Sequence, residues 1–301
     1  MIFLPFFGKT IKYENKSEEI MSYAHPEVLV NTEWLSQNPP NEKRKLVEVD
    51  YDPVNGYQKG HINGASLIWW KRDINDPITR DIISKKEFEA LMAKNGITAD
   101  TEVILYGDFN NWFAAFAFWV FKIYGHENLK IMDGGRKKWE LENKDYTTDE
   151  PQIAPTTYVA QPPDEGLRAY LFDVSRALGK DDSVMVDVRS PAEFTGQITA
   201  PPEYPMEHAQ RGGHIPDANN IPWATAVNDA DGTFKAVEEL RQNYVPKGVT
   251  PDKDVICYCR IGERSSHSWF VLKYLLGYPK VRNYDGSWTE WGNMIGNPVE
   301  K

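Results

Sequence analysis

The chain has few cysteines and no long hydrophobic run, and both absences exclude classes of protein. Cys257 and Cys259 are the only thiols in 301 residues. Two thiols separated by one residue cannot form a disulfide framework and are too few for a structural zinc site, so we expect no metal and a reducing compartment. No stretch approaches the ~20 apolar residues of a membrane span, and the apolar residues 1–7 are too short for a signal sequence. We therefore expect a soluble, cytoplasmic protein without a membrane partner.

Positive charge is also scarce. The chain has 34 Lys and Arg against 44 Asp and Glu, which gives a net charge of −10. This balance argues against nucleic acid or an anionic membrane as the main partner. The hydrophobic content of 41% is typical of a globular protein, and the length suffices for two domains. Nothing in the sequence specifies an oligomeric state.

The second half of the chain repeats the first. Residues 103–139 match residues 255–291 without a gap at an offset of 152, and Gly-His-Ile occurs at both 60–62 and 213–215. A repeat of this length predicts a duplicated domain rather than a solenoid unit. We expect an N-terminal extension (1–22), a first domain (23–146), a polar, proline-punctuated linker (147–165) and a second domain (166–301).

Short β-branched runs alternate with helical segments in both copies. The expected strands are 46–49, 66–68, 103–106, 130–132, 184–188, 220–221, 255–258 and 281–284. The expected helices are 32–37, 85–94, 112–124, 170–178, 236–243 and 265–276. This alternation predicts the α/β class, with two similar domains that are each an open parallel sheet covered by helices on both faces. Ligands of such sheets bind beyond the carboxyl ends of the strands.

Cys259 follows the strand 255–258 and precedes a helix, so it lies where ligands bind. An open helix N-terminus and two nearby cations, Arg260 and Arg264, lower a cysteine pKa from about 8.5 to roughly 3.5–7.5. We therefore predict that Cys259 is a reactive thiolate, and that these two arginines bind a small anion. Cys257 lies inside the strand and is expected to pack in the core.

The loop after Cys259 is suited to hold an anion with its backbone. Gly262 allows the chain to curl so that successive N–H groups converge on the sulfur. The residues whose backbone forms this predicted cradle are Ile261, Gly262, Glu263 and Ser265. Ser265 is also expected to be the N-cap of the following helix.

The first copy provides an internal control. At an offset of 152, Gly107, Asp108 and Trp112 occupy the places of Cys259 and its two arginines. The first copy has therefore lost the thiol and both cations. We assign the chemistry to the second domain and a structural or interface role to the first. The histidines His61 and His214 recur in both copies, and we interpret them as turn-stabilising rather than catalytic.

The loop 259–267, the Gly-His-Ile segments and the closing residues 284–291 together resemble a tandem-domain rhodanese of the bacterial and archaeal thiosulfate sulfurtransferase type. The resemblance covers nearly the whole chain from about residue 23. It implies two like α/β domains with the active cysteine only in the second. It also implies a double displacement, in which the thiolate takes the outer sulfur of thiosulfate as a persulfide, releases sulfite and passes the sulfur to cyanide or a thiol. No cofactor other than the covalent persulfide is expected.

The positive side chains suit this chemistry. A dianion near a thiolate meets a repulsion of about 4 kcal/mol per pair of unit charges at 4 Å and an effective dielectric of 20. Arg260 and Arg264 are placed to offset that repulsion and to hold the departing sulfite. Arg189 ends a strand beside the loop with Asp187. We include it among the substrate-binding candidates and favour bracing of the loop as its role.

Departures from the family pattern leave alternatives open. Ile261 and Glu193 stand where animal-type enzymes have basic residues, which makes 3-mercaptopyruvate an alternative donor. Arg260 favours thiosulfate, because relatives that use mercaptopyruvate have a small residue after the cysteine. A persulfide carrier or regulatory module is a further alternative. A cysteine phosphatase is disfavoured, because it needs Cys-x5-Arg and the spacing from Cys259 to Arg264 is Cys-x4-Arg.

Overall fold

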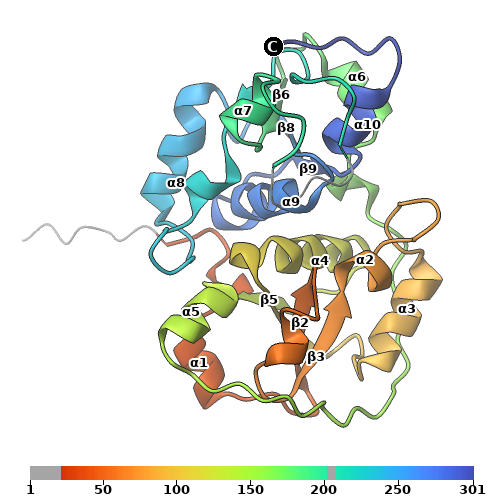
Figure 1. Ribbon diagram of the computed structural model, residues 1–301, viewed down its shortest axis with the longest axis vertical. Helices are drawn as coiled ribbons and strands as arrows, with labels where there is room; N and C mark the ends of the chain where they lie inside the picture. Colours follow the sequence, from red (N-terminus) through yellow and green to blue (C-terminus); the bar gives the residue numbers. More distant parts are fainter. Residues whose placement is uncertain (1–21, 202–207) are drawn as a thin grey trace, which may run out of the picture.

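The computed structural model describes residues 22–201 and 208–301 and has two α/β lobes, one above the other (Figure 1). Of the expected extension, only residue 22 lies within the described residues. No helix within the described residues combines the length and the apolar character that crossing a bilayer requires.

The first lobe contains a five-stranded parallel sheet in the order β1-β5-β4-β2-β3. Its strands are β1 (Leu29–Val30), β2 (Arg44–Asp50), β3 (Ala65–Trp69), β4 (Glu102–Tyr106) and β5 (Leu129–Met132). Its helices are α1 (Thr32–Gln37), α2 (Trp70–Asp73), α3 (Lys85–Lys94), α4 (Trp112–Ile123) and α5 (Gly135–Leu141).

The second lobe contains a four-stranded parallel sheet in the order β7-β6-β8-β9. Its strands are β6 (Ser183–Asp187), β7 (Asn219–Asn220), β8 (Asp254–Tyr258) and β9 (Val281–Tyr284). Its helices are α6 (Leu171–Ala177), α7 (Pro191–Phe194), α8 (Val237–Tyr244), α9 (Glu263–Phe270) and α10 (Ser287–Asn293). A π-helix, Val271–Leu275, extends α9.

Helices cover both faces of each sheet, as predicted. Alternate residues of a strand face opposite sides, and both sides of the first sheet are apolar. Val103 and Leu105 pack toward α3 and α4, whereas Ile104 packs toward the side of α1 and α5. The second sheet repeats the pattern, since Val255 and Ile256 belong to different core clusters. The prediction of two similar α/β domains is confirmed.

One hydrophobic core runs through both lobes. The helices α4 and α9 occupy equivalent places in the two copies and lie side by side at the boundary (Figure 1). Phe118 of α4 contacts Phe270 of α9, with ring centroids 4.9 Å apart. This packing brings the first lobe against the helix that follows Cys259.

Several elements differ from expectation. Strand β1 has only two residues, and the sequence pattern did not predict it. The short helices α2, α5, α7 and α10 were not predicted either. The predicted helix 265–276 begins earlier, at Glu263, and its last part is the π-helix.

Candidate active site

The loop that carries Cys259 joins β8 to α9 at the carboxyl end of an inner strand. Gly262 adopts a φ of +100°, and a Cβ there would lie 2.7 Å from the Cβ of Asp285, so a larger residue would be strained. The Gly262 amide donates to Cys259 Sγ at 3.1 Å. The backbone amides of Ile261 and Ser265 also hydrogen-bond this sulfur. The amides therefore converge on the sulfur, an arrangement that suits an anion.

The sulfur is enclosed by protein. The exposed fraction of Cys259 is 0%. Burial raises the pKa of the Cys259 thiol and Glu263 raises it further, while Arg264 and the loop amides only partly oppose the rise. The expectation of a resting thiolate with a lowered pKa is therefore wrong for this structure. The helix terminus and the cations are visible in the sequence, whereas the desolvation arises only from the fold.

The carboxylate of Glu263 faces the sulfur. Cys259 Sγ donates to Glu263 Oε2 at 3.4 Å, and the glutamate is 2% exposed. From the sequence, only a backbone role was expected for Glu263. A negative charge this close to a thiol disfavours the thiolate, which explains part of the raised pKa.

Arg264 forms a buried ion pair with Glu193 of α7. Its two Nη atoms each donate to one carboxylate oxygen of Glu193 at 2.9 Å. Burial would raise the pKa of Glu193, but the hydrogen bonds and charge of Arg264 outweigh it and lower the pKa to about 2. The Arg264 guanidinium also lies 5.9 Å from the ring centre of Trp112 in the first lobe. Much of its charge is therefore balanced by a partner that the sequence analysis did not predict.

Ser265 is not the N-cap of α9. The helix begins at Glu263 with Gly262 as its N-cap, so Ser265 lies inside the first turn. Its hydroxyl donates to Asn283 Oδ1 at 2.6 Å. Ser265 therefore ties the loop to β9, and the N-cap prediction is wrong because the helix starts two residues before it.

The sequence that forms this site matches a known protein family. Two segments, residues 31–142 and 173–294, match the Rhodanese-like domain. The chain belongs to the rhodanese family. It is 55% identical over 284 residues to the "Sulfur carrier protein TtuD" of Thermus thermophilus, covering 93% of this chain and 99% of that protein. It is 52% identical over 274 residues to a Saccharopolyspora erythraea protein named "Putative thiosulfate sulfurtransferase", covering 91% and 96%.

Solved structures of similar fold include chains longer than this one. The wild-type structure of EanB has a TM-score of 0.81 and 25% identity, covering 93% of this chain and 70% of that chain. An anaerobic ergothioneine biosynthesis enzyme from Chlorobium limicola, solved with trimethyl histidine, also has a TM-score of 0.81 and 25% identity, covering 92% and 71%. The resemblance to a tandem rhodanese is confirmed, and the chain is a sulfurtransferase of that family.

The Arg189 side chain of this rhodanese makes bracing contacts. Arg189 donates to both carboxylate oxygens of Asp187 and, at 2.8 Å, to the carbonyl oxygen of Gly213. Its guanidinium lies 4.8 Å from the ring centre of Trp288. These contacts are those expected of a residue that braces the loop, and a role in substrate binding stays a prediction. Arg260 is fully buried within the loop.

The first rhodanese domain contributes to the walls of the site. Arg80 Nη2 donates to the carbonyl oxygen of Ile261 at 3.3 Å, from a backbone with a φ of +64°. Trp112 meets Trp223 edge to face, with ring centroids 4.8 Å apart. The sequence signal for Arg80 is absent, because it lies 181 residues from its partner.

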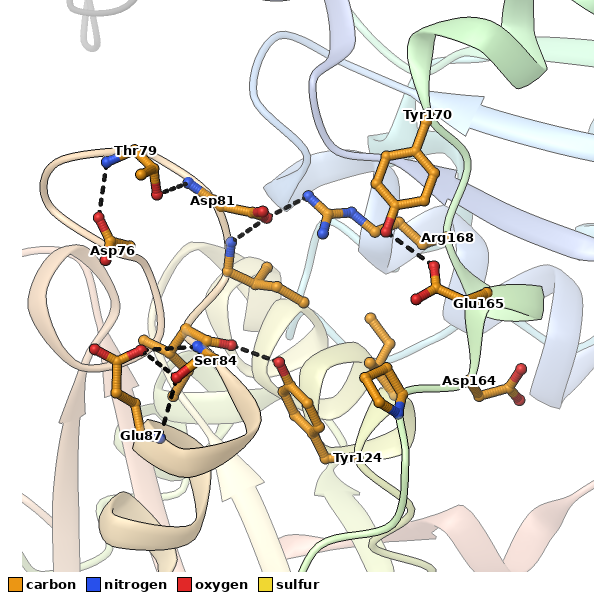
Figure 2. A pocket seen from close by; sticks show the side chains of 14 residues that line it. Asp76, Thr79, Asp81, Ser84, Glu87, Tyr124, Asp164, Glu165, Arg168 and Tyr170 are labelled. Atoms are coloured by element: carbon orange, nitrogen blue, oxygen red, sulfur yellow. Dashed lines mark hydrogen bonds and ion pairs between the residues drawn. The ribbon is translucent and has the colours of Figure 1, made fainter.

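A cleft of about 400 Å³ borders the catalytic loop between the two domains. It is lined by residues that include Thr79, Arg80, Arg168, Ile261 and Glu290. A neighbouring pocket of about 280 Å³ shares Arg168 (Figure 2). Figure 2 shows Arg168 reaching Asp81 of the first domain, and the two side chains are 2.6 Å apart. Charged side chains thus connect the domains at the edge of the loop.

The histidines occupy structural positions. His61 and His214 hydrogen-bond the carbonyl oxygens of Tyr57 and Phe194, both at 3.0 Å, which agrees with turn stabilisation. His267 is different, since neither ring nitrogen has a hydrogen-bond partner among the described residues. Burial lowers the pKa of His267 to about 3, so the ring is neutral.

Proposed function

We propose that this rhodanese is a thiosulfate sulfurtransferase that carries the transferred sulfur as a persulfide on Cys259. The observation that carries the proposal is the convergence of backbone amides on Sγ, with the Gly262 amide at 3.1 Å. Preorganised amides stabilise negative charge in a site that excludes water. They would hold the outer sulfur of a persulfide as well as the thiolate that precedes it.

The proposed reaction has two displacements. In the first, the Cys259 sulfur bonds to the outer sulfur of thiosulfate, and the sulfur–sulfur bond of the donor breaks with its electron pair on sulfite. In the second, the sulfur of a thiol or the carbon of cyanide attacks the outer sulfur of the persulfide and releases the Cys259 thiolate. The partners are therefore a small anionic donor and a small thiophilic acceptor, and the cysteine persulfide takes the place of a cofactor.

The cations of the loop are assigned to the donor. Arg260 and Arg264 would attract the dianion and the departing sulfite. Arg189 would support the loop through its contacts with Asp187, Gly213 and Trp288. Glu193 balances part of the charge of Arg264, so Arg260 and the amides take the larger share of the binding. A reducing compartment such as the cytoplasm would keep both the enzyme thiol and an acceptor thiol reduced.

Steady-state release of sulfite from thiosulfate tests the proposal. We expect continuous turnover with cyanide or a small thiol as acceptor, and a gain of one sulfur atom on the peptide that carries Cys259 after treatment with thiosulfate alone. Cys259→Ser should reduce turnover by at least about 1,000-fold and leave the fold intact. Absence of sulfite release by the wild-type protein would contradict the proposal, and faster turnover of 3-mercaptopyruvate measured side by side would reassign the donor.

A persulfide carrier is the second candidate. It is favoured by the 55% identity to a protein named a sulfur carrier, and by the enclosure of the Cys259 sulfur. A carrier would release sulfite in one stoichiometric burst with small acceptors, whereas an enzyme turns over. The same assay therefore separates the two functions.

A further inference from the structure

The two copies use the residue at the start of the active helix differently. In the first copy this position is Asn111, whose side chain accepts from the Gly107 amide at 3.0 Å and donates to the Met132 carbonyl at 2.8 Å. Asn111 therefore closes its own loop. The equivalent residue of the second copy is Glu263, at an offset of 152.

In the second copy another side chain closes the loop. The Cys259 amide donates to Ser287 Oγ at 3.1 Å. The first copy has Gly135 at the place of Ser287, and a Cβ there would lie 2.6 Å from Asn111 Oδ1. Ser287 accepts the hydrogen bond of the Cys259 amide, which Asn111 accepts from Gly107 in the first copy. The side chain of Glu263 is therefore not needed for this hydrogen bond and faces the sulfur instead.

Several charged groups surround the pair of Glu263 and Cys259. Arg264 Nε lies 3.7 Å from Glu263 Oε1, and the rest of its guanidinium binds Glu193 on α7. Arg260 lies in the same loop, and the neutral His267 lies one turn further along α9. From the first domain, the uncharged Trp112 faces Arg264, and the positively charged Arg80 reaches the carbonyl oxygen of Ile261. A buried carboxylate is costly without partners, so Glu263 depends on Arg264 and the thiol proton.

We propose that Glu263 is a catalytic residue that accepts the proton of the Cys259 thiol when the sulfur attacks its donor. The Sγ–H bond breaks, an Oε2–H bond forms, and the Cys259 sulfur bonds to the outer sulfur of thiosulfate. The electron pair of the broken sulfur–sulfur bond leaves on sulfite, which takes the proton from Glu263 and departs as hydrogen sulfite. The nucleophile is thus formed on demand from a buried thiol rather than stored as a thiolate. The identity of the donor rests on the proposed function, whereas the proton transfer does not.

The proposal predicts how the thiol titrates. Two interacting acids lose their protons in two macroscopic steps, and loss of the first proton already gives the reactive pair. A positioned base contributes about 10²- to 10⁴-fold to a rate. In Glu263→Gln the reactive form appears only when the thiol itself ionises, so the acid limb of the pH–rate profile moves to higher pH.

The test combines two pH profiles on the full-length protein. We expect kcat/KM for thiosulfate at pH 6 to fall by about 100-fold or more in Glu263→Gln, with a smaller deficit at pH 9. Labelling of Cys259 by iodoacetamide, followed by mass spectrometry, should show two ionisations in the wild-type protein and one in the variant. Glu263→Asp should restore part of the acid limb, and the exposed Glu239→Gln serves as a control for loss of one negative charge.

Each outcome decides one claim. A uniform loss of rate with both pH profiles unchanged in Glu263→Gln would overturn the role of Glu263 as proton acceptor. Should Glu263→Gln not fold, an Asp variant whose labelling profile has a single ionisation would overturn it equally. A wild-type protein with a two-step labelling profile and no turnover of thiosulfate would reject the proposed donor and keep the proton acceptor.

Discussion

The loops 107–112 and 259–264 occupy equivalent places in the two domains, but they differ in backbone and in side chains. Phe109, Asn110 and Asn111 all have positive φ in the first loop, whereas only Gly262 does in the second. In both loops the carbonyl of the first residue accepts an amide from the last helix of its domain, Arg136 at 3.0 Å and Trp288 at 3.1 Å. The first loop has an acid, Asp108, where the second has Arg260, and burial together with Asp50 raises the pKa of Asp108 to about 7. The fold therefore fixes where the loop is attached, whereas the convergence of amides on Cys259 Sγ and the nearby cations belong to the second loop.

The supporting ion pairs show the same division. Each domain has a buried ion pair between an acid and an arginine. In both domains the guanidinium also donates to the carbonyl oxygen of the glycine in the Gly-His-Ile segment. In the first domain Arg136 pairs with Glu48 and donates to Gly60 at 2.9 Å, and in the second Arg189 donates to Gly213 at 2.8 Å. The arginine comes from α5 in one copy and from the loop after β6 in the other. The contact is retained although its residue has moved.

Arg264→Met should give the largest effect on stability and activity. It removes a cation of the second loop, whose place in the first loop is taken by the uncharged Trp112. It leaves Glu193 buried without its partner, and breaking a buried pair costs about 3–5 kcal/mol. We expect this loss in the free energy of unfolding at pH 7, with a raised KM and a lowered turnover for thiosulfate. The pKa of Glu193 is lowered from 4.5 in the unfolded chain to about 2 in the folded protein. Its contribution to stability is therefore fully present at pH 7 and is lost as the pH falls from 4.5 through 2.

A double variant separates the two consequences. Arg264→Met with Glu193→Leu removes both charges and fills a similar volume, so most of the stability should return. Activity should not return with it. Recovery of wild-type turnover by the double variant would show that the cation is dispensable.

Gly107→Cys tests whether the first loop can be made like the second. A Cβ at this position would lie 2.5 Å from the carbonyl oxygen of Val49. We expect a loss of about 1–3 kcal/mol of stability from overpacking, measured by denaturant unfolding. In the background of Cys259→Ser the new thiol should give no sulfur transfer, and measurable turnover there would contradict the assignment of chemistry to the second loop alone.

His267→Phe probes the apolar surroundings of the active helix. The ring of His267 stacks on Phe234 at a centroid distance of 5.0 Å, and burial lowers its pKa from 6.5 to about 3. Below pH 6.5, His267 is protonated in the unfolded chain but stays neutral in the folded protein. Lowering the pH therefore reduces the free energy of unfolding of the wild-type protein by roughly 1.4 kcal/mol per pH unit through this residue. The phenylalanine variant should therefore gain about 2 kcal/mol relative to wild type between pH 7.5 and pH 5. An unfolding free-energy difference that does not change with pH would contradict the neutral state of this ring.

Cys257→Ser should have the smallest effect. Cys257 is buried in β8, and burial raises the pKa of its thiol, so it is an inert core residue. We expect most of the sulfurtransferase activity to remain and a modest loss of stability from the buried hydroxyl. Loss of turnover comparable to that of Cys259→Ser would show that both thiols take part.

The internal repeat made much of the fold predictable. Once Tyr106 and Tyr258 are aligned, the parallel strands and the absence of a nucleophile from the first copy follow from the sequence alone. The amide cradle was also predictable, because Gly262 lies between a strand and a helix. Short elements such as β1 were not predictable, since two residues show no periodicity.

The electrostatic state of the site could not be read from the sequence. Glu193 lies 71 residues from Arg264, and its local pattern indicates only a helix start. The first domain contacts the loop from more than 150 residues away, through Arg80 at Ile261 and Trp112 at Arg264. The sequence shows two cations and Glu263 close to the thiol, whereas the fold determines that Glu263 faces the sulfur and that water is excluded.

The packing of α4 against α9 has a consequence for how the molecule comes apart. A hinge motion that separated the lobes would expose aromatic side chains such as Phe118 and Trp269, which share one cluster. Wide separation of the lobes is therefore costly. A substrate must reach the Cys259 sulfur through small displacements of side chains at the boundary between the lobes. For the same reason the two lobes should melt together, so that heating gives one calorimetric peak and a chain severed between them yields no autonomous catalytic half.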